Sequence, residues 1–172
     1  MTVGGVTLDP VTKTPVVLLR DEREELTLPI WVGLLEATAM ATELEGVKMA
    51  RPMTHDLLKR IVEEVGASVS RIIVTDLREN TFYAEIELMV GDVRHCLDAR
   101  PSDAISLALR TGCPIFVARE VIDASSASTE AGEDEDAAEI DLDATLDLSD
   151  VSREDWTEIL ENLDPDDFKY KM

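Results

Sequence analysis

The sequence predicts an α+β fold, with a mixed, mostly antiparallel sheet, about three helices, an acidic linker and a C-terminal helix. Two observations carry this prediction. Short apolar stretches separated by polar turns are typical of strands connected by hairpins rather than of regular βαβ units. At intervals the apolar residues instead recur at three- and four-residue spacing, which is typical of helices with one buried face.

The N-terminal part predicts three strands. The apolar stretches VGGVTL, PVVLLR and ELTLPIWV are separated by the polar segments DPVTKT and DEREE. Turns this short join neighbouring strands that run in opposite directions. We therefore expect an antiparallel meander before the first helix.

Two helices are predicted after the meander. The first begins at Leu34, where the apolar spacing changes, and ends before Gly46, because glycine is favoured just past a helix C-terminus. The second has Thr54 as its expected N-cap and ends at Gly66. Its buried face is expected to consist of Leu57, Leu58, Ile61, Val62 and Val65.

The next segment returns to strands and closes with one more helix. The stretches VSRIIVTDL and TFYAEIELMV flank the turn RENT, and the dipeptide GD at 91–92 leads into a further strand, VRHCLD. A third helix is expected to begin near Pro101 and to end at Gly112. The stretch PIFVA then reads as a short closing strand.

Composition divides the chain into one domain and two acidic segments, with boundaries at 1–122, 123–150 and 151–172. The formal net charge is −21; residues 1–122 hold 19 acidic and 13 basic side chains, and residues 123–172 hold 18 acidic and 3 basic ones. Most of the negative charge therefore belongs to the C-terminal part. Few large apolar residues occur over 123–150, so we expect a disordered linker there.

The segment 151–172 is predicted to begin with an amphipathic helix. Ser152 is an expected cap, and an apolar stripe follows it at helical spacing. A lone short helix is marginally stable in water, so we expect it to bind its own domain, a second protomer or another protein partner. The stripe consists of Trp156, Ile159, Leu160 and Leu163.

Several classes of protein are disfavoured by what the sequence lacks. No apolar run approaches the roughly 20 residues of a membrane-spanning helix, and the start MTVGGVTLDP has neither the basic nor the apolar region of a signal peptide. We therefore expect a cytoplasmic protein with no membrane partner. The absence of GxxxxGK[ST], GxSxG and HExxH disfavours P-loop NTPases, serine hydrolases and zinc proteases.

The strand-to-helix joint DARPSD concentrates charge where the third helix begins, with Asp98, Arg100, Ser102 and Asp103 within six residues. In one interpretation these residues only cap the helix and pair with each other. In another, the helix N-terminus and Arg100 bind a phosphate group while Asp98 and Asp103 hold a divalent cation beside it. The residues alone leave both interpretations open.

A similar joint precedes the second helix. The segment ARPMTHDLL at 50–58 repeats the Ala-Arg-Pro start, and places Arg51, His55 and Asp56 around a helix N-terminus. His55 is a candidate general base or ligand, although a histidine in a first helical turn is commonly a solvated surface residue. Glu36 opens the first helix, where the helix dipole favours a carboxylate without any catalytic role.

The signatures LPIWVG, EA, LEG, RPMTHDLL, DL...TFYA and DARPSDAISLALR occur in this order. On these residues the chain resembles the bifunctional nuclease domain family over residues 3–122. The resemblance implies a compact α+β domain that forms a homo-oligomer and cleaves DNA and RNA with a divalent metal, Mg²⁺ or Mn²⁺. Ala50 stands where the family commonly has proline, which affects the rigidity of the loop before Arg51.

The leading hypothesis is therefore a metal-assisted nuclease that binds nucleic acid. The candidate metal ligands are Asp98, Asp103 and Glu36, the candidate phosphate contacts are Arg51, Arg100 and Ser102, and the candidates for proton transfer are His55 and Asp56. The low basic and aromatic content argues against it. The alternatives are a non-enzymatic regulatory or scaffold domain whose Arg/Asp loops are structural, and a module that binds a small phosphorylated ligand.

Overall fold

Three antiparallel strands open the chain, as the sequence predicts. The computed structural model describes residues 1–10, 12–23 and 26–131. Strands β1 (Thr2–Leu8), β2 (Pro15–Arg20) and β3 (Thr27–Trp31) form a sheet in the order β1-β2-β3. Strand β2 is buried along most of its length because both of its neighbours and the helices cover it.

A second sheet contains the remaining strands, whereas the sequence predicted one sheet. It consists of β4 (Ala67–Arg78), β5 (Thr81–Val90), β6 (Val93–Ala99) and β7 (Ile115–Val117). Their order is β6-β5-β4-β7, and β7 is parallel to β4 while the other pairs are antiparallel. The α+β class is confirmed, and buried side chains of both sheets belong to one hydrophobic core.

The predicted helices are α1 (Leu34–Leu44), α2 (Thr54–Glu64) and α3 (Pro101–Thr111). Gly66 and Gly112 follow α2 and α3 with φ of +75° and +69°, a left-handed conformation that glycine adopts at little cost. Within the described ranges, no helix has the length and apolar character that would let it span a membrane.

A further helix, α4 (Arg119–Ala131), occupies the place where the sequence predicted the start of the acidic linker at residue 123. It packs against β4, and Val121 is buried in the core. Tertiary packing therefore stabilises a helix in a segment whose composition favours disorder. The rest of the predicted linker and the predicted C-terminal helix at 151–172 lie outside the described residues.

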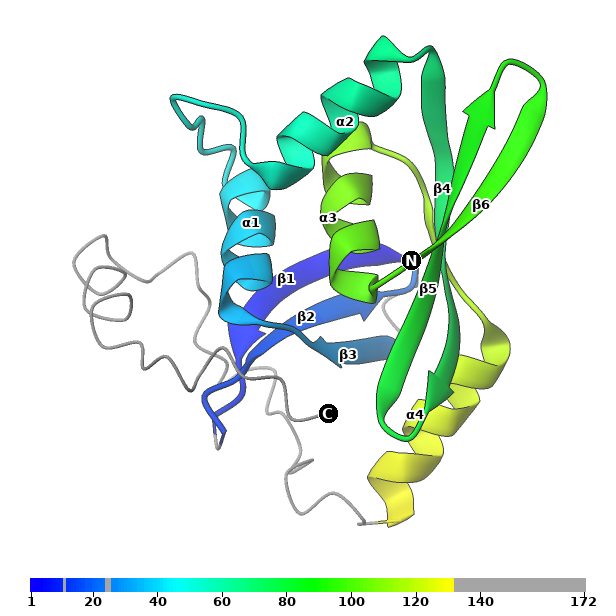
Figure 1. Ribbon diagram of the computed structural model, residues 1–172. Coiled ribbons are helices and arrows are strands. Elements are labelled where there is room, and N and C mark those ends of the chain that lie inside the picture. Colours follow the sequence, from blue (N-terminus) through cyan, green and yellow to red (C-terminus); the bar gives the residue numbers. More distant parts are fainter. Residues whose placement is uncertain (11, 24–25, 132–172) are drawn as a thin grey trace.

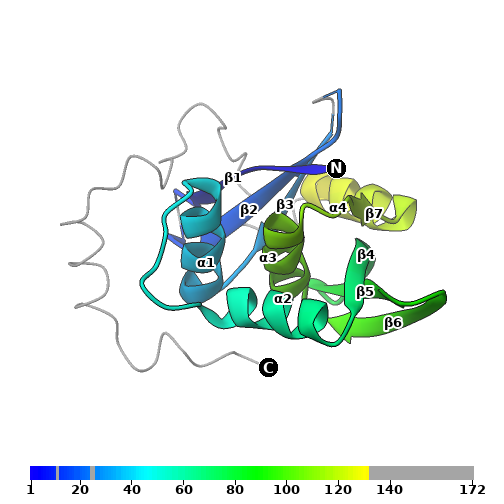
Figure 2. The ribbon, with the colours of Figure 1, turned by 90° about the horizontal axis from the view of Figure 1, so that it is seen from above.

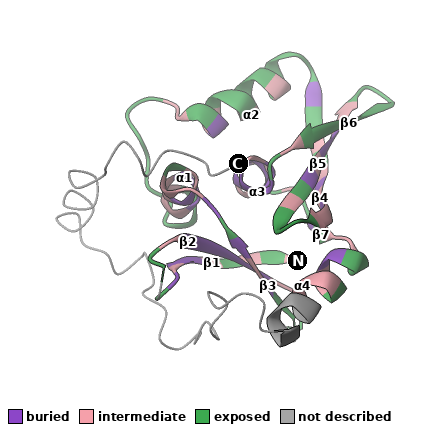
Figure 3. Cartoon of the chain, turned by 60° about the horizontal axis from the view of Figure 1, so that its bottom comes forward, coloured by how far each residue is buried: buried purple, intermediate pink, exposed green. Residues whose placement is uncertain are grey.

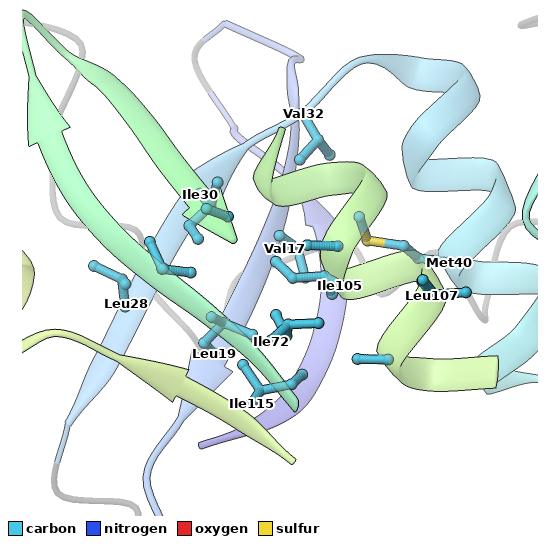
Figure 4. Packing of buried hydrophobic residues seen from close by; sticks show 14 of the residues in the cluster. Val17, Leu19, Leu28, Ile30, Val32, Met40, Ile72, Ile105, Leu107 and Ile115 are labelled. Atoms are coloured by element: carbon cyan, nitrogen blue, oxygen red, sulfur yellow. The ribbon is translucent and has the colours of Figure 1, made fainter. Parts of the chain in front are cut away.

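Helix α3 lies at the centre of the core, between the two sheets (Figures 1 and 2). Ile105 and Leu107 of this helix point toward side chains from β2, β4 and α1 (Figure 4). Most residues of α3 are buried, among them the polar Ser102, Ser106 and Arg110. The N-terminus of α3, which carries the predicted phosphate-binding residues, is thus held in place by the whole domain.

The predicted buried stripe of α2 is wrong. Leu57, Leu58, Ile61 and Val65 are exposed, and among the residues of this helix only His55 is buried. Figure 3 shows α2 and β6 as largely exposed elements. The helix is attached to α3 through the polar side chains of His55, Asp56 and Lys59, and not through its apolar face.

Candidate functional site

Three of the predicted site residues meet at the N-terminus of α3. Arg100, the residue before the helix, donates from Nε to Asp103 Oδ2 at 2.8 Å and from Nη2 to Asp103 Oδ1 at 3.2 Å. The same Nη2 lies 3.1 Å from Glu36 Oε1 in the first turn of α1. Two carboxylates from different helices therefore hold one guanidinium.

His55 completes this group, which we call the Arg100 cluster: Glu36, His55, Arg100 and Asp103. The Nε2 atom of His55 lies 3.2 Å from Asp103 Oδ1. The Nδ1 atom is buried and has no hydrogen-bond partner in the part of the chain that the structure describes. Because Nε2 contacts Asp103 and Nδ1 is buried, His55 positions Asp103 in this arrangement rather than presenting a free base.

The carboxylate of Asp103 is ionised at neutral pH. Partial burial opposes its ionisation, but hydrogen bonds from Arg100 and His55 outweigh that effect and hold the pKa of Asp103 below its usual value. A third of the Asp103 side chain remains exposed, and about half of the Arg100 side chain does (33% and 52%). The cluster is therefore tied together without being sealed from solvent.

A groove of about 320 Å³ adjoins the cluster. It is open to solvent and is lined by residues 30–33 at the end of β3, residues 80–82 at the tip of the β4–β5 hairpin and residues 100–102 at the start of α3. Arg100 and Ser102 belong to this lining, and Ser102 is buried. A helix N-terminus beside a solvent-accessible guanidinium favours an anionic ligand such as phosphate.

Glu36 reaches Arg100 because its side chain folds back over Gly33 at the start of α1. A Cβ atom at position 33 would overlap the Oε2 atom of Glu36. Glycine at this position therefore leaves the space that the Glu36 carboxylate occupies. The motif WVGLLE, in which the glycine precedes the glutamate by three residues, is the sequence signal for this contact.

Asp56, a candidate for proton transfer, belongs to a different group. Its Oδ1 accepts from Arg110 Nε at 2.6 Å and its Oδ2 accepts from the backbone N–H of Met53 at 2.8 Å. The hydrogen bond from Arg110, then that from Met53, holds the pKa of Asp56 below its usual value. Asp56 therefore joins α2 to α3.

Arg110 is the residue that sequence reasoning missed. Its side chain is only 4% exposed and also donates to the carbonyl oxygens of Ser106 and Ala39, each at 3.0 Å. It thus links α1, α2 and α3 from one buried position. An arginine in the last turn of a helix is ordinarily explained by the helix dipole; the apolar residues around it in LALRTG were the one available signal.

The structure does not bring Arg51 or Asp98 into the Arg100 cluster. Arg51 is exposed in the loop between α1 and α2. Asp98 lies opposite Glu85 in the β5–β6 ladder, next to the Leu97–Ile86 pair. Because Ile86 faces the core and side chains alternate along a strand, Asp98 lies on the outer face of the sheet.

The predicted metal ligands are therefore divided. Glu36 and Asp103 both contact Arg100, whereas Asp98 lies on the other side of the second sheet. In residues 1–10, 12–23 and 26–131, no three His, Cys, Asp or Glu side chains are grouped so that they would hold a metal ion. The donor set expected from the sequence does not fit a three-ligand site.

Comparison with known proteins places this fold and site in a family. The model of the bifunctional nuclease domain matches residues 17–130. The chain belongs to the bifunctional nuclease domain family. The four residues of the Arg100 cluster, Arg110 and the groove all lie within the matched part.

Relatives of this bifunctional nuclease domain differ in how much of the chain they share. An uncharacterized protein of Mycobacterium tuberculosis is 36% identical over 167 residues, which cover 97% of this chain and 96% of that protein. Bifunctional nuclease 2 of Arabidopsis thaliana is 32% identical over 117 residues, 66% of this chain and 36% of the plant protein. Bifunctional nuclease 1 of Oryza sativa subsp. japonica is 28% identical over 109 residues, 62% of this chain and 33% of its own length. The mycobacterial similarity thus extends into the acidic C-terminal part, and the plant similarity covers about the domain alone.

Proposed function

We propose that this protein is a phosphodiester hydrolase that cleaves DNA and RNA at the groove beside the Arg100 cluster. One observation carries the proposal. The guanidinium of Arg100 is about half exposed, lines the groove at the N-terminus of α3 and is oriented by two carboxylates from separate helices. The plant relatives named bifunctional nucleases support the same activity.

The groove also offers surfaces for nucleobases. Trp31 and Phe82 belong to its lining, and Trp31 is 40% exposed. Aromatic side chains beside a phosphate contact are a common arrangement for single-stranded nucleic acid, because bases stack on them without regard to sequence. A single strand bound here would place a phosphate at Arg100 and an adjacent base on the aromatic side chains.

Hydrolysis needs a proton acceptor and stabilisation of negative charge. Water attacks phosphorus, one P–O ester bond breaks, and the departing oxygen takes a proton from solvent. In the proposed step, Arg100 offsets the charge that develops on the phosphoryl oxygens, and the ionised Asp103 accepts the proton of the attacking water. His55 and Glu36 keep these two groups in position.

Participation of Mg²⁺ or Mn²⁺ stays a prediction from the sequence. The steps above use only side chains of the chain, because the carboxylates expected as ligands are divided between two sides of a sheet. Metal dependence is therefore measured directly, by cleavage with each ion and with a chelator. Cleavage that persists in excess chelator would contradict the metal prediction.

The proposal is tested with labelled single- and double-stranded DNA and RNA oligonucleotides. We expect Arg100→Ala and Asp103→Asn each to reduce cleavage by about 10²-fold, as loss of a transition-state contact does. Arg119→Ala serves as the matched control, because the Arg119 side chain is 84% exposed and pairs only within α4 in the described structure. Wild-type cleavage that neither substitution reduces, in variants shown to be folded, would refute the site.

One observation favours the alternative of a non-enzymatic scaffold. The second Arg/Asp group, Asp56 with Arg110, is a buried structural link between helices, and the first group is built from similar residues. If wild-type protein cleaves no oligonucleotide with either metal, and Asp103→Asn instead lowers the stability of the fold, the scaffold interpretation replaces the nuclease proposal.

A further inference from the structure

Helix α2 presents an apolar face that no described part of the chain covers. Leu57, Leu58, Ile61 and Val65 are 52%, 36%, 51% and 67% exposed. They follow helical spacing, so their side chains lie along one stripe. We call these four residues the α2 face. A continuous stripe of this kind is typical of a helix that binds another element.

Further apolar side chains lie on the same side of the second sheet. Leu97 and Val93 of β6 stand opposite Ile86 and Val90 of β5. Ile86 belongs to the core, which also contains residues of α3. Every second side chain along a strand lies on the same face, as do directly paired side chains, so Val90, Val93 and Leu97 lie on the side of Ile86 that faces the helices. Helix α2 packs against both α3 and β4. The exposed Val93 and Leu97 therefore extend the apolar surface that begins at α2.

Basic residues surround this surface in an otherwise acidic domain. Residues 47–65, which include the whole α2 face, contain Lys48, Arg51, Lys59 and Arg60 against Asp56, Glu63 and Glu64, a net charge of +1. Residues 1–122 as a whole have 19 acidic and 13 basic side chains, a net charge of −6. An acidic amphipathic segment is the complement of a surface that is apolar at its centre and basic around it.

We propose that residues 152–163 of the same chain bind the α2 face. This segment carries its own apolar stripe, Trp156, Ile159, Leu160 and Leu163, at helical spacing. Residues 152–163 contain four carboxylates and one arginine, a net charge of −3. In this complex the apolar stripe of residues 152–163 covers the α2 face, and the carboxylates of the same segment lie near Lys48, Arg51 and Arg60.

The connecting segment is long enough for this contact. Twenty residues, 132–151, separate the last described residue from the binding segment. A flexible chain of that length spans about 25 Å on average and about 65 Å when extended. A domain of this size is about 35 Å across. The tether also keeps the segment at a high effective concentration beside its own domain.

A second copy of the chain complements this surface less well. In a symmetric dimer through α2, the same patch meets itself, so Lys48, Arg51 and Arg60 of each copy would lie near those of the other. The repulsion of these like charges disfavours the dimer at low ionic strength. The tail segment has the opposite charge and avoids this repulsion.

The test uses the fluorescence of Trp156 in the full-length chain. Trp31→Phe removes the other tryptophan, and excitation at a wavelength that tyrosine does not absorb isolates Trp156. We expect blue-shifted emission that is poorly quenched by acrylamide. Leu57→Asp should shift the emission toward that of free tryptophan and increase quenching severalfold, and Leu35→Asp should not. Leu35 is the matched control because it is also an exposed helical leucine, at 59% against 52%.

Two outcomes would overturn the proposal. Trp156 emission that is unchanged by Leu57→Asp and by Ile61→Asp shows that the segment does not bind the α2 face. A blue-shifted emission that depends on protein concentration, in a species of dimeric mass by light scattering, shows that a second copy covers the face. Circular dichroism of each variant checks that the domain remains folded, which we expect because the substituted residues are exposed.

Discussion

Arg110 should be the residue on which the packing of the three N-terminal helices depends most. Replacing it with methionine keeps a long flexible side chain and removes the guanidinium. Three hydrogen bonds are lost, those to the Asp56 carboxylate and to the carbonyl oxygens of Ala39 and Ser106. The carboxylate of Asp56 also loses its closest positive partner.

The size of the effect follows from burial. Removing one partner of a buried ion pair costs about 3–5 kcal/mol, mainly because the other charge is left unpaired. The Arg110 side chain is 4% exposed but that of Asp56 is 30% exposed, so water compensates part of the loss. We therefore expect Arg110→Met to lower the free energy of unfolding by about 3 kcal/mol, a large part of the 5–15 kcal/mol of an average domain.

Urea unfolding followed by circular dichroism measures this change. With an m-value of about 2 kcal/mol per M, the midpoint should fall by about 1.5 M. Arg119→Met makes the same chemical change at a side chain that is 84% exposed, and should alter stability by less than about 0.5 kcal/mol. A loss below about 1 kcal/mol for Arg110→Met would refute the reasoning, because the three contacts would then contribute no more than one exposed pair.

Three further predictions concern the acid range, the glycine before α1 and the C-terminal segment. Hydrogen bonds from Arg110 and then from the backbone N–H of Met53 lower the pKa of Asp56 in the folded protein. Its ionised carboxylate therefore stabilises the fold at pH values above the pKa of an unfolded aspartate, and this stabilisation is lost as the pH falls through the lower pKa of the folded state. Asp56→Asn should therefore flatten the acid limb of a stability-versus-pH curve measured by urea unfolding, and an unchanged limb would contradict this. Gly33→Ala should displace Glu36 from Arg100 and reduce oligonucleotide cleavage more than stability; equal losses of both would argue for a general packing role. Deletion of 132–172 leaves α4 in place and should raise oligonucleotide affinity. The increase should be largest at low salt, because ions screen the repulsion between like charges. An affinity that does not respond to the deletion would show that the acidic segment does not shield the groove.

The local elements of the domain were predictable from the sequence because short-range sterics and alternation decide them. Strands β1 to β3 follow apolar stretches between polar turns, and α3 begins at Pro101 and is capped by Gly112. Proline has no backbone N–H to lose in a first helical turn, and glycine adopts the left-handed conformation that ends a helix. These effects act within a few residues of the chain, so they leave a clear pattern.

The site was predictable only in part. The sequence marks Arg100 and Asp103 as neighbours at a helix N-terminus, since they are three residues apart. It does not show that His55 meets Asp103, which lies 48 positions away, nor that Arg110 binds Asp56, 54 positions away. Such contacts depend on how whole helices pack, and no local signal distinguishes Arg110 from an ordinary arginine in a last helical turn.

By itself the sequence determined the α+β class, the ends of most helices and strands, and the charged N-terminus of α3, because backbone conformation and side-chain period are local properties. The tertiary structure decided which faces are buried. The apolar stripe of α2 is exposed while α4 forms in an acidic segment, with Val121 buried in the core. Burial depends on which elements meet in space, and the hydrophobic effect rewards apolar area removed from water rather than any pattern along the chain.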